Sequence, residues 1–285
     1  MLNALYLMII ILTGSGQGIV QKPYTKRTGG KGTFFFNTII SAAALLFFVI
    51  TSSGLHFEAG ILPYSIVFAV AYATASVATV LGIAWGSLSL TLLFVAYSLI
   101  MPTLYGLIFL KDPVGFGFVP GLILLFTSIF LINVKKGEEK EKFSLKWIVC
   151  VTIAFLGNGV CTVTQKMQQV AFDGAYKNEF MIAALGMVFV TLLAMSLLKE
   201  RKEIKVYARA GAHLALICGL LNGAVNLFVM ILSARMPVAI MFPLVSAGRL
   251  IVTYLASRFL YKEALSRNQF IGFLLGMAAV VCLNL

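Results

Sequence analysis

The sequence predicts an all-α integral membrane protein with ten transmembrane helices, arranged as two inverted five-helix repeats. Three observations support this fold class. The chain is 60% hydrophobic and only 11% charged, whereas a soluble globular domain has roughly 25% charged residues. Its charge-free runs are long enough to cross a bilayer. Its two halves also resemble each other in order.

The charge-free runs define the predicted helices. A hydrocarbon core about 30 Å thick takes roughly 20 helical residues. The run 59–110 is too long for one crossing, so we expect it to fold back near Gly86-Ser87. The runs lack the apolar–polar alternation of barrel strands. A further apolar run, 236–257, is broken by one charge, Arg249. The predicted crossings are 1–21, 32–57, 62–84, 88–110, 113–134, 147–165, 180–198, 210–234, 236–257 and 268–285.

An internal repeat divides the chain. GSGQGIVQK (14–22) aligns with NGVCTVTQK (158–166), and LKDPVGFGFVPG (110–121) aligns with LYKEALSRNQFIG (260–272). We therefore predict repeats at 1–135 and 147–285, joined by a charged linker at 136–146. An odd number of crossings in each repeat requires the second repeat to enter from the opposite side, which inverts it, as in many secondary transporters.

Loop charges predict the orientation. Positive residues concentrate in the odd-numbered loops, for example in KPYTKRTGGK (22–31) and KERKEIKVYAR (199–209). The positive-inside rule then places these loops in the cytoplasm and both termini on the extracytoplasmic side. The first run has a counterpart in mid-chain, so we expect a structural helix there rather than a cleaved signal.

Other function classes lack their signatures. The net charge of +12 lies in short clusters between apolar runs, which does not form the basic face of a nucleic-acid-binding domain. The four cysteines are scattered through apolar runs, with no metal-ligand spacing. The glycine-rich TGSGQG at 13–18 follows no strand and lacks nucleotide-binding spacing. We expect no cofactor and no metal.

The last fifty residues suggest a family. A proline-containing helix is followed by a Lys-Glu pair and a glycine-rich helix, with Pro243, Glu263, Gly272 and Gly276 in order. This pattern resembles the drug/metabolite transporter superfamily, specifically its EamA-type ten-helix members. In the first half, Asp112 and Gly121 follow the pattern, and Leu92 stands where the proline would align. The resemblance implies solute transport and says little about the substrate.

Small four-helix multidrug relatives in this superfamily resemble one half of the chain. Their first helix has a membrane-embedded glutamate that binds protons and cationic drugs. The matching helices here contain Gln17, Gln21, Asn158 and Gln165, and no acid. This departure argues against proton-coupled export of cations.

Arg249 is the strongest candidate for a substrate-binding residue. It lies near the middle of the crossing 236–257, where a charge costs roughly 2.5–3.5 kcal/mol on insertion scales. One reading is a counter-ion for a carboxylate or phosphate. The other is a structural contact with backbone carbonyls at a helix break, such as one near Pro243.

Polar residues on helix faces are further candidates. Asn222 and Asn226 are four residues apart and share one face, beside Gly219 and Gly223, which could admit a ligand. Gln17 and Gln21 share a face of the first helix, as Asn158 and Gln165 do on the sixth. Interhelical hydrogen bonding is the alternative for all of them.

Three tyrosines lie inside crossings: Tyr72, Tyr97 and Tyr254. They could hydrogen-bond or stack on a solute, although packing is the more frequent role. We expect Lys166 to extend to the membrane interface. The pairs Gly117/Gly121 and Gly272/Gly276 predict close helix packing, either within the chain or between subunits of a homodimer.

These features favour a secondary transporter that moves a small anionic or zwitterionic metabolite by alternating access. The alternative is an exporter of lipophilic or cationic compounds. A membrane enzyme is less favoured, because every acidic residue lies at a predicted helix end or in a loop.

Overall fold

The structure is a computed structural model, and it describes residues 2–52, 54–85, 91, 95, 97–98, 100–111, 115–133, 144–261 and 267–283. Within these ranges the chain is helical, with ten α-helices and two short 3₁₀ turns. The α-helices are α1 (Leu2–Thr28), α2 (Thr33–Thr51), α3 (Leu62–Trp85), α5 (Ile100–Phe109), α6 (Phe118–Asn133), α7 (Leu145–Ala171), α8 (Lys177–Lys199), α9 (Ile204–Ser233), α10 (Val238–Tyr261) and α11 (Arg267–Leu283). The turns are η1 (Ala59–Ile61) and η2 (Arg201–Glu203).

Among the described residues, six helices are long and apolar enough to cross a membrane: α1, α2, α3, α7, α8 and α9. Each contains an apolar stretch of the length that a bilayer requires, with few charges inside it. The described part of the chain is therefore all-helical with several candidate spans, as in a multi-pass membrane protein.

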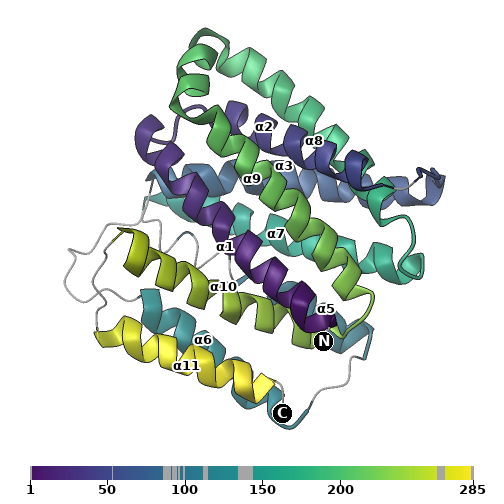
Figure 1. Cartoon of the computed structure of the whole chain (residues 1–285), viewed down its shortest axis with the longest axis vertical. Helices are drawn as coiled ribbons and strands as arrows, with labels where there is room; N and C mark the ends of the chain where they lie inside the picture. Colours follow the sequence, from purple (N-terminus) through teal and green to yellow (C-terminus); the bar gives the residue numbers. More distant parts are fainter. Residues whose placement is uncertain are drawn as a thin grey trace.

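The six long helices pack as one body (Figure 1). Helix α1 runs antiparallel to α9, because the Tyr6 ring packs against Phe228 at one end and Arg27 donates to the Ala210 carbonyl at the other. Helices α3 and α7 are also antiparallel, because Gly157 lies beside Ala75 and Gly82 beside Val151. They are in close contact, since a Cβ on Gly157 would lie 2.8 Å from the Cβ of Ala75. Short side chains at such crossings let two helices approach closely.

The remaining helices, α5, α6, α10 and α11, lie beside the first body (Figure 1). Helices α6 and α11 are antiparallel and joined by a hydrogen bond from Ser128 Oγ to the Gly272 carbonyl, 2.5 Å long. Gly276 packs against the same serine, so one predicted glycine pair does serve close packing within the chain. Helix α10 connects the two groups by packing along α1.

The described helices overlap the predicted crossings, and several extend beyond them. The crossing 88–110 is described mainly over α5, and α2 ends at Thr51, short of the predicted end at residue 57. Helix α1 continues through Pro23 to Thr28, and α7 continues to Ala171. Charge-free runs mark only the part of a helix suited to hydrocarbon, whereas the helix itself can continue where charges meet water. The predicted fold-back at Gly86-Ser87, most of the linker 136–146, Asp112 and Glu263 lie outside the described residues.

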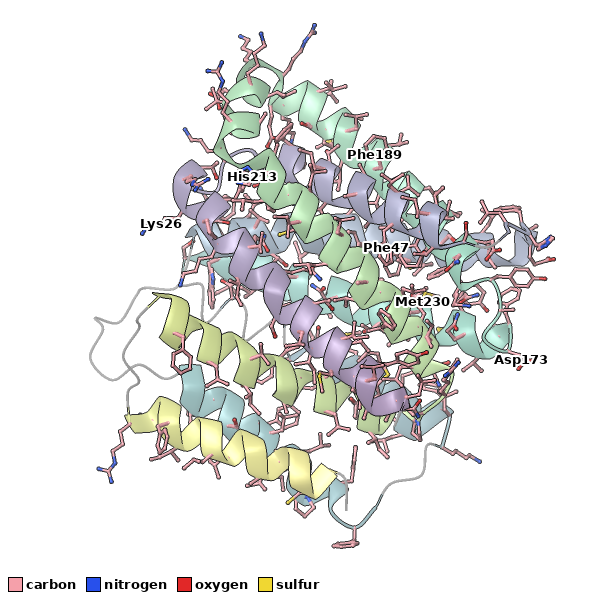
Figure 2. All side chains as sticks on the ribbon, in the orientation of Figure 1. Lys26, Phe47, Asp173, Phe189, His213 and Met230 are labelled. Atoms are coloured by element: carbon pink, nitrogen blue, oxygen red, sulfur yellow. The ribbon has the colours of Figure 1, made fainter. Side chains whose placement is uncertain are left out.

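The two ends of the helical body differ in charge. Lys26 and His213 lie at one end and Asp173 at the other (Figure 2). The basic segments 22–31 and 199–209 meet at the first end, because the backbone N–H of Phe34 donates to Glu200. Helix α1 begins and α11 ends at the opposite end of the body (Figure 1).

Candidate functional site

Asn222 is the centre of a hydrogen-bond network between helices. Its Oδ1 accepts from the Tyr72 hydroxyl of α3 at 3.1 Å, and its Nδ2 donates to Gln17 Oε1 of α1 at 3.2 Å. Asn222 itself is buried in α9. Three helices are therefore joined at one amide, near the middle of α1 and of α9.

The network continues into a fourth helix. Asn226 Nδ2 donates to Asn222 Oδ1 at 3.0 Å, and Gln165 Nε2 of α7 donates to Asn226 Oδ1 at 2.8 Å. The four-residue spacing places both asparagines on one face of α9. Gln165 and Asn226 are buried, whereas Gln17 and Tyr72 are half-buried. Five of the predicted site residues therefore form one continuous cluster.

Arg249 lies near the middle of α10, as predicted. Its Nη2 donates to the Gly14 carbonyl of α1 at 3.2 Å, and its own carbonyl accepts from Ser15 Oγ at 3.1 Å. The side chain is half-buried. A Cβ on Gly14 would lie 2.6 Å from Arg249 Nε, so the absence of a side chain there leaves the room that the guanidinium occupies.

The arginine and the amide network meet on α1. Gly14 and Gln17 are three residues apart, which places them about one turn from each other on neighbouring faces. Helix α1 thus has a backbone acceptor for Arg249 on one turn and a side chain of the network on the next. The polar centre of the protein is the region around these two turns.

The other predicted residues lie outside this cluster. Asn158 is half-buried and donates to the Ala154 carbonyl of its own helix at 2.8 Å. Tyr97 packs near Phe126. Gln21 is half-buried about one turn along α1 from Gln17. Tyr254 belongs to α10, but its side chain lies outside the described residues.

Two expectations require correction. Gly219 and Gly223 do not make room for a ligand: a Cβ on Gly219 would lie 2.6 Å from the Ile40 carbonyl of α2, and one on Gly223 would lie 2.7 Å from the Phe47 ring. Lys166 does not extend to an exposed interface. It is buried, and its Nζ donates to the Ser233 carbonyl at 2.6 Å. Ser233 ends α9, where carbonyls without helical partners attract a cation.

Sequence reasoning missed the roles of Gly14 and Ser15. Both lie in TGSGQG, a segment whose spacing excludes a nucleotide-binding loop. Small residues inside an apolar crossing are the available signal, because they permit another helix to approach the backbone. In the described ranges no group of three or more His, Cys, Asp or Glu side chains could hold a metal ion.

Comparison with known proteins identifies a fold. One solved protein crystal structure superposes on this chain with a TM-score of 0.74, covering 98% of this chain and 95% of its own length at 13% sequence identity. No protein-family profile and no curated protein sequence matches the chain. At this identity the similarity shows a shared architecture over nearly the whole chain and carries no information about activity.

Proposed function

We propose that the protein is a secondary transporter that moves a small anionic or zwitterionic polar metabolite across the membrane by alternating access. Arg249 is the observation that carries this proposal. A guanidinium has five N–H donors in a planar fork that matches a carboxylate or phosphate. The Gly14 carbonyl is the one hydrogen-bond acceptor for these donors among the described residues.

Among the described residues, no acidic side chain neutralises the charge of Arg249. The described acids lie at helix ends or in loops: Glu58, Asp173, Glu179, Glu200 and Glu203. A charge in the membrane centre without a counter-ion costs roughly 2.5–3.5 kcal/mol. An anionic group of a substrate would offset this cost, and Arg249 would select for that group.

The amide network supplies the neighbouring polar surface in this proposal. Gln17 and Tyr72 are its half-buried members, so they are the ones that a bound solute reaches first. Asn222, Asn226 and Gln165 lie behind them and hold their orientation through hydrogen bonds. Gln21, Asn158, Tyr97 and Tyr254 remain predicted contacts for another stage of the transport cycle.

The arrangement of helices supports the proposed inverted repeats, 1–135 and 147–285. When the halves are exchanged in chain order, the pair α1–α9 becomes α7–α3, and both pairs are in contact and antiparallel. The pairs α2–α8 and α6–α11 map onto themselves. Both are antiparallel, which a two-fold axis in the membrane plane requires and an axis along the membrane normal forbids.

This architecture and the resemblance to EamA-type members of the drug/metabolite transporter superfamily lead to the same proposal. Ten crossings in two inverted halves can exchange conformations and so open to either side. We also propose that the basic end faces the cytoplasm and both termini face outward. A C-terminal reporter found in the cytoplasm would contradict this orientation.

The decisive experiment is a thermal-shift screen of purified protein against amino acids, carboxylates, sugar phosphates, nucleotide sugars and organic cations. A ligand that binds the folded state raises its melting temperature. We expect anionic or zwitterionic compounds to stabilise the wild type. They should stabilise Arg249→Lys weakly or not at all, and should not stabilise Arg249→Ala. Uptake or exchange of the same compound in proteoliposomes then tests transport.

The screen also distinguishes the alternative. Stabilisation by organic cations alone, unchanged in Arg249→Ala, would overturn the proposed substrate class and favour export of cationic or lipophilic compounds. Binding without movement of the compound in proteoliposomes would overturn transport itself.

A further inference from the structure

The turn between α8 and α9 has a concentration of exposed positive charge. Figure 2 shows nitrogen-tipped side chains extending outward from this turn at the top of the view. Arg201, Lys202, Lys205 and Arg209 are all exposed. In the described part of the chain, none of these four side chains has a hydrogen-bond or ion-pair partner.

The two acids in this turn are directed toward the protein. Glu200 accepts from the backbone N–H groups of Phe34 and Phe35, at 3.1 and 2.7 Å. Glu203 accepts from the Tyr207 hydroxyl. Both carboxylates therefore have donors within the protein, and no acid among the described residues pairs with the four basic side chains.

The turn lies where a membrane surface would be. It connects two candidate spans, Lys177–Lys199 and Arg201–Ser233. Leu198 is 80% exposed and Val206 is 62% exposed, so apolar side chains accompany the charges. A segment with this combination lies in the interface between headgroups and acyl chains.

The turn is also fixed to the rest of the protein. Tyr207 is buried against the turn between α1 and α2, where a Cβ on Gly32 would lie 2.6 Å from Tyr207 Cγ. The backbone leaves helical geometry at Gly211, which separates the segment 204–210 from the long part of α9. The basic side chains are therefore held in a defined place and are not part of a mobile tail.

We propose that this turn, residues 199–209, is a binding surface for the phosphate headgroups of anionic phospholipids. The absence of a paired acid among the described residues, the exposed apolar side chains and the position between two candidate spans all fit a lipid phosphate at the bilayer surface. Each basic residue near an anionic surface strengthens binding roughly fivefold. Bound lipid would stabilise the α8–α9 turn and, through Tyr207 and Glu200, the beginning of α2.

The test compares melting temperatures in nanodiscs of phosphatidylcholine alone and of phosphatidylcholine mixed with phosphatidylglycerol. We expect the wild type to melt higher in the mixed nanodiscs, and added salt to remove the difference. The variant Arg201→Gln/Lys202→Gln/Lys205→Gln/Arg209→Gln should lose the difference. The control Lys111→Gln/Lys177→Gln/Arg235→Gln, with charges removed at the opposite end, should retain it.

Equal melting of the wild type in both nanodiscs would overturn the proposal, as would a difference that survives in the turn variant. Inorganic phosphate added to protein in neutral detergent tests the second source of the same chemistry. A shift with phosphate and none with phosphatidylglycerol would assign the surface to a soluble anion instead of a lipid.

Discussion

The amide network and Arg249 contact α1 about one turn apart, at Gln17 and Gly14, but their hydrogen bonds differ. Asn222 and Asn226 of α9 and Gln165 of α7 are buried and bond to one another across these two helices. Arg249 is half-buried and bonds to a single backbone carbonyl among the described residues. A network with satisfied amides holds helices together, whereas a cation with uncommitted donors is available to a ligand. The two regions should therefore fail in different assays.

The largest expected effect is on ligand binding, from Gly14→Ala. The added Cβ would lie 2.6 Å from Arg249 Nε and 2.9 Å from its Cζ, so the guanidinium must move. Disturbing one partner of a hydrogen-bonded charge pair costs about 2–5 kcal/mol, or roughly 30-fold or more in affinity. Binding of the anionic compound identified by thermal shift measures this loss.

Gly18→Ala is the matched control on the same helix, because nothing lies within 4 Å of its added Cβ. It should bind like the wild type. If Gly14→Ala also binds the compound like the wild type, the position of Arg249 beside α1 does not matter for ligand binding. Arg249 would then not differ in function from the amide network.

The next effect is on stability, from Gly219→Ala. The new Cβ would lie 2.6 Å from the Ile40 carbonyl, a backbone atom that cannot move aside as a flexible side chain can. Overpacking of this kind costs about 1–3 kcal/mol. The free energy of unfolding should fall by that amount. Gly186→Ala in α8, where nothing lies within 4 Å, should leave it unchanged.

A smaller loss of stability is expected for Asn226→Leu. The substitution removes the acceptor of Gln165 Nε2 and the donor to Asn222. Interhelical hydrogen bonds in membranes contribute about 0.6 kcal/mol on average and at most about 1.7. Asn158→Leu removes only a bond within one helix and should cost less. Loss of ligand binding without loss of stability would instead make Asn226 a direct substrate contact.

The smallest effect concerns pH and Glu200, outside the spans. Desolvation raises the pKa of its carboxyl above the ordinary 4.5, although the N–H donors of Phe35 and Phe34 oppose the rise. An acid with a raised folded-state pKa binds protons more readily when folded, so its contribution to stability falls as pH rises from about 4.5 through that raised value. The free energy of unfolding should be measured across this pH range for the wild type and for Glu200→Gln. The fall in stability that Glu200 causes should be present in the wild type and absent in the variant.

Two kinds of prediction from the sequence had different outcomes. The helical segments followed from long apolar runs, and the described helices overlap them. The position of Arg249 near the middle of its apolar run also agrees with its place in α10. Five of the polar residues selected from the sequence meet in one network, but the sequence did not identify their partners. Asn222 bonds to Tyr72 and Gln17, which are separated from it by 150 and 205 residues.

The sequence by itself determined the helical, apolar character of the chain, because the cost of placing charge in hydrocarbon acts on each segment locally. The tertiary structure was needed to show which polar side chains meet and that Lys166 is buried at the end of α9. It also showed that α2 packs against Gly219 and that Arg249 packs against Gly14. Those outcomes depend on how helices distant in sequence pack together. Periodicity assigns a residue to a face and leaves open which helix that face will meet.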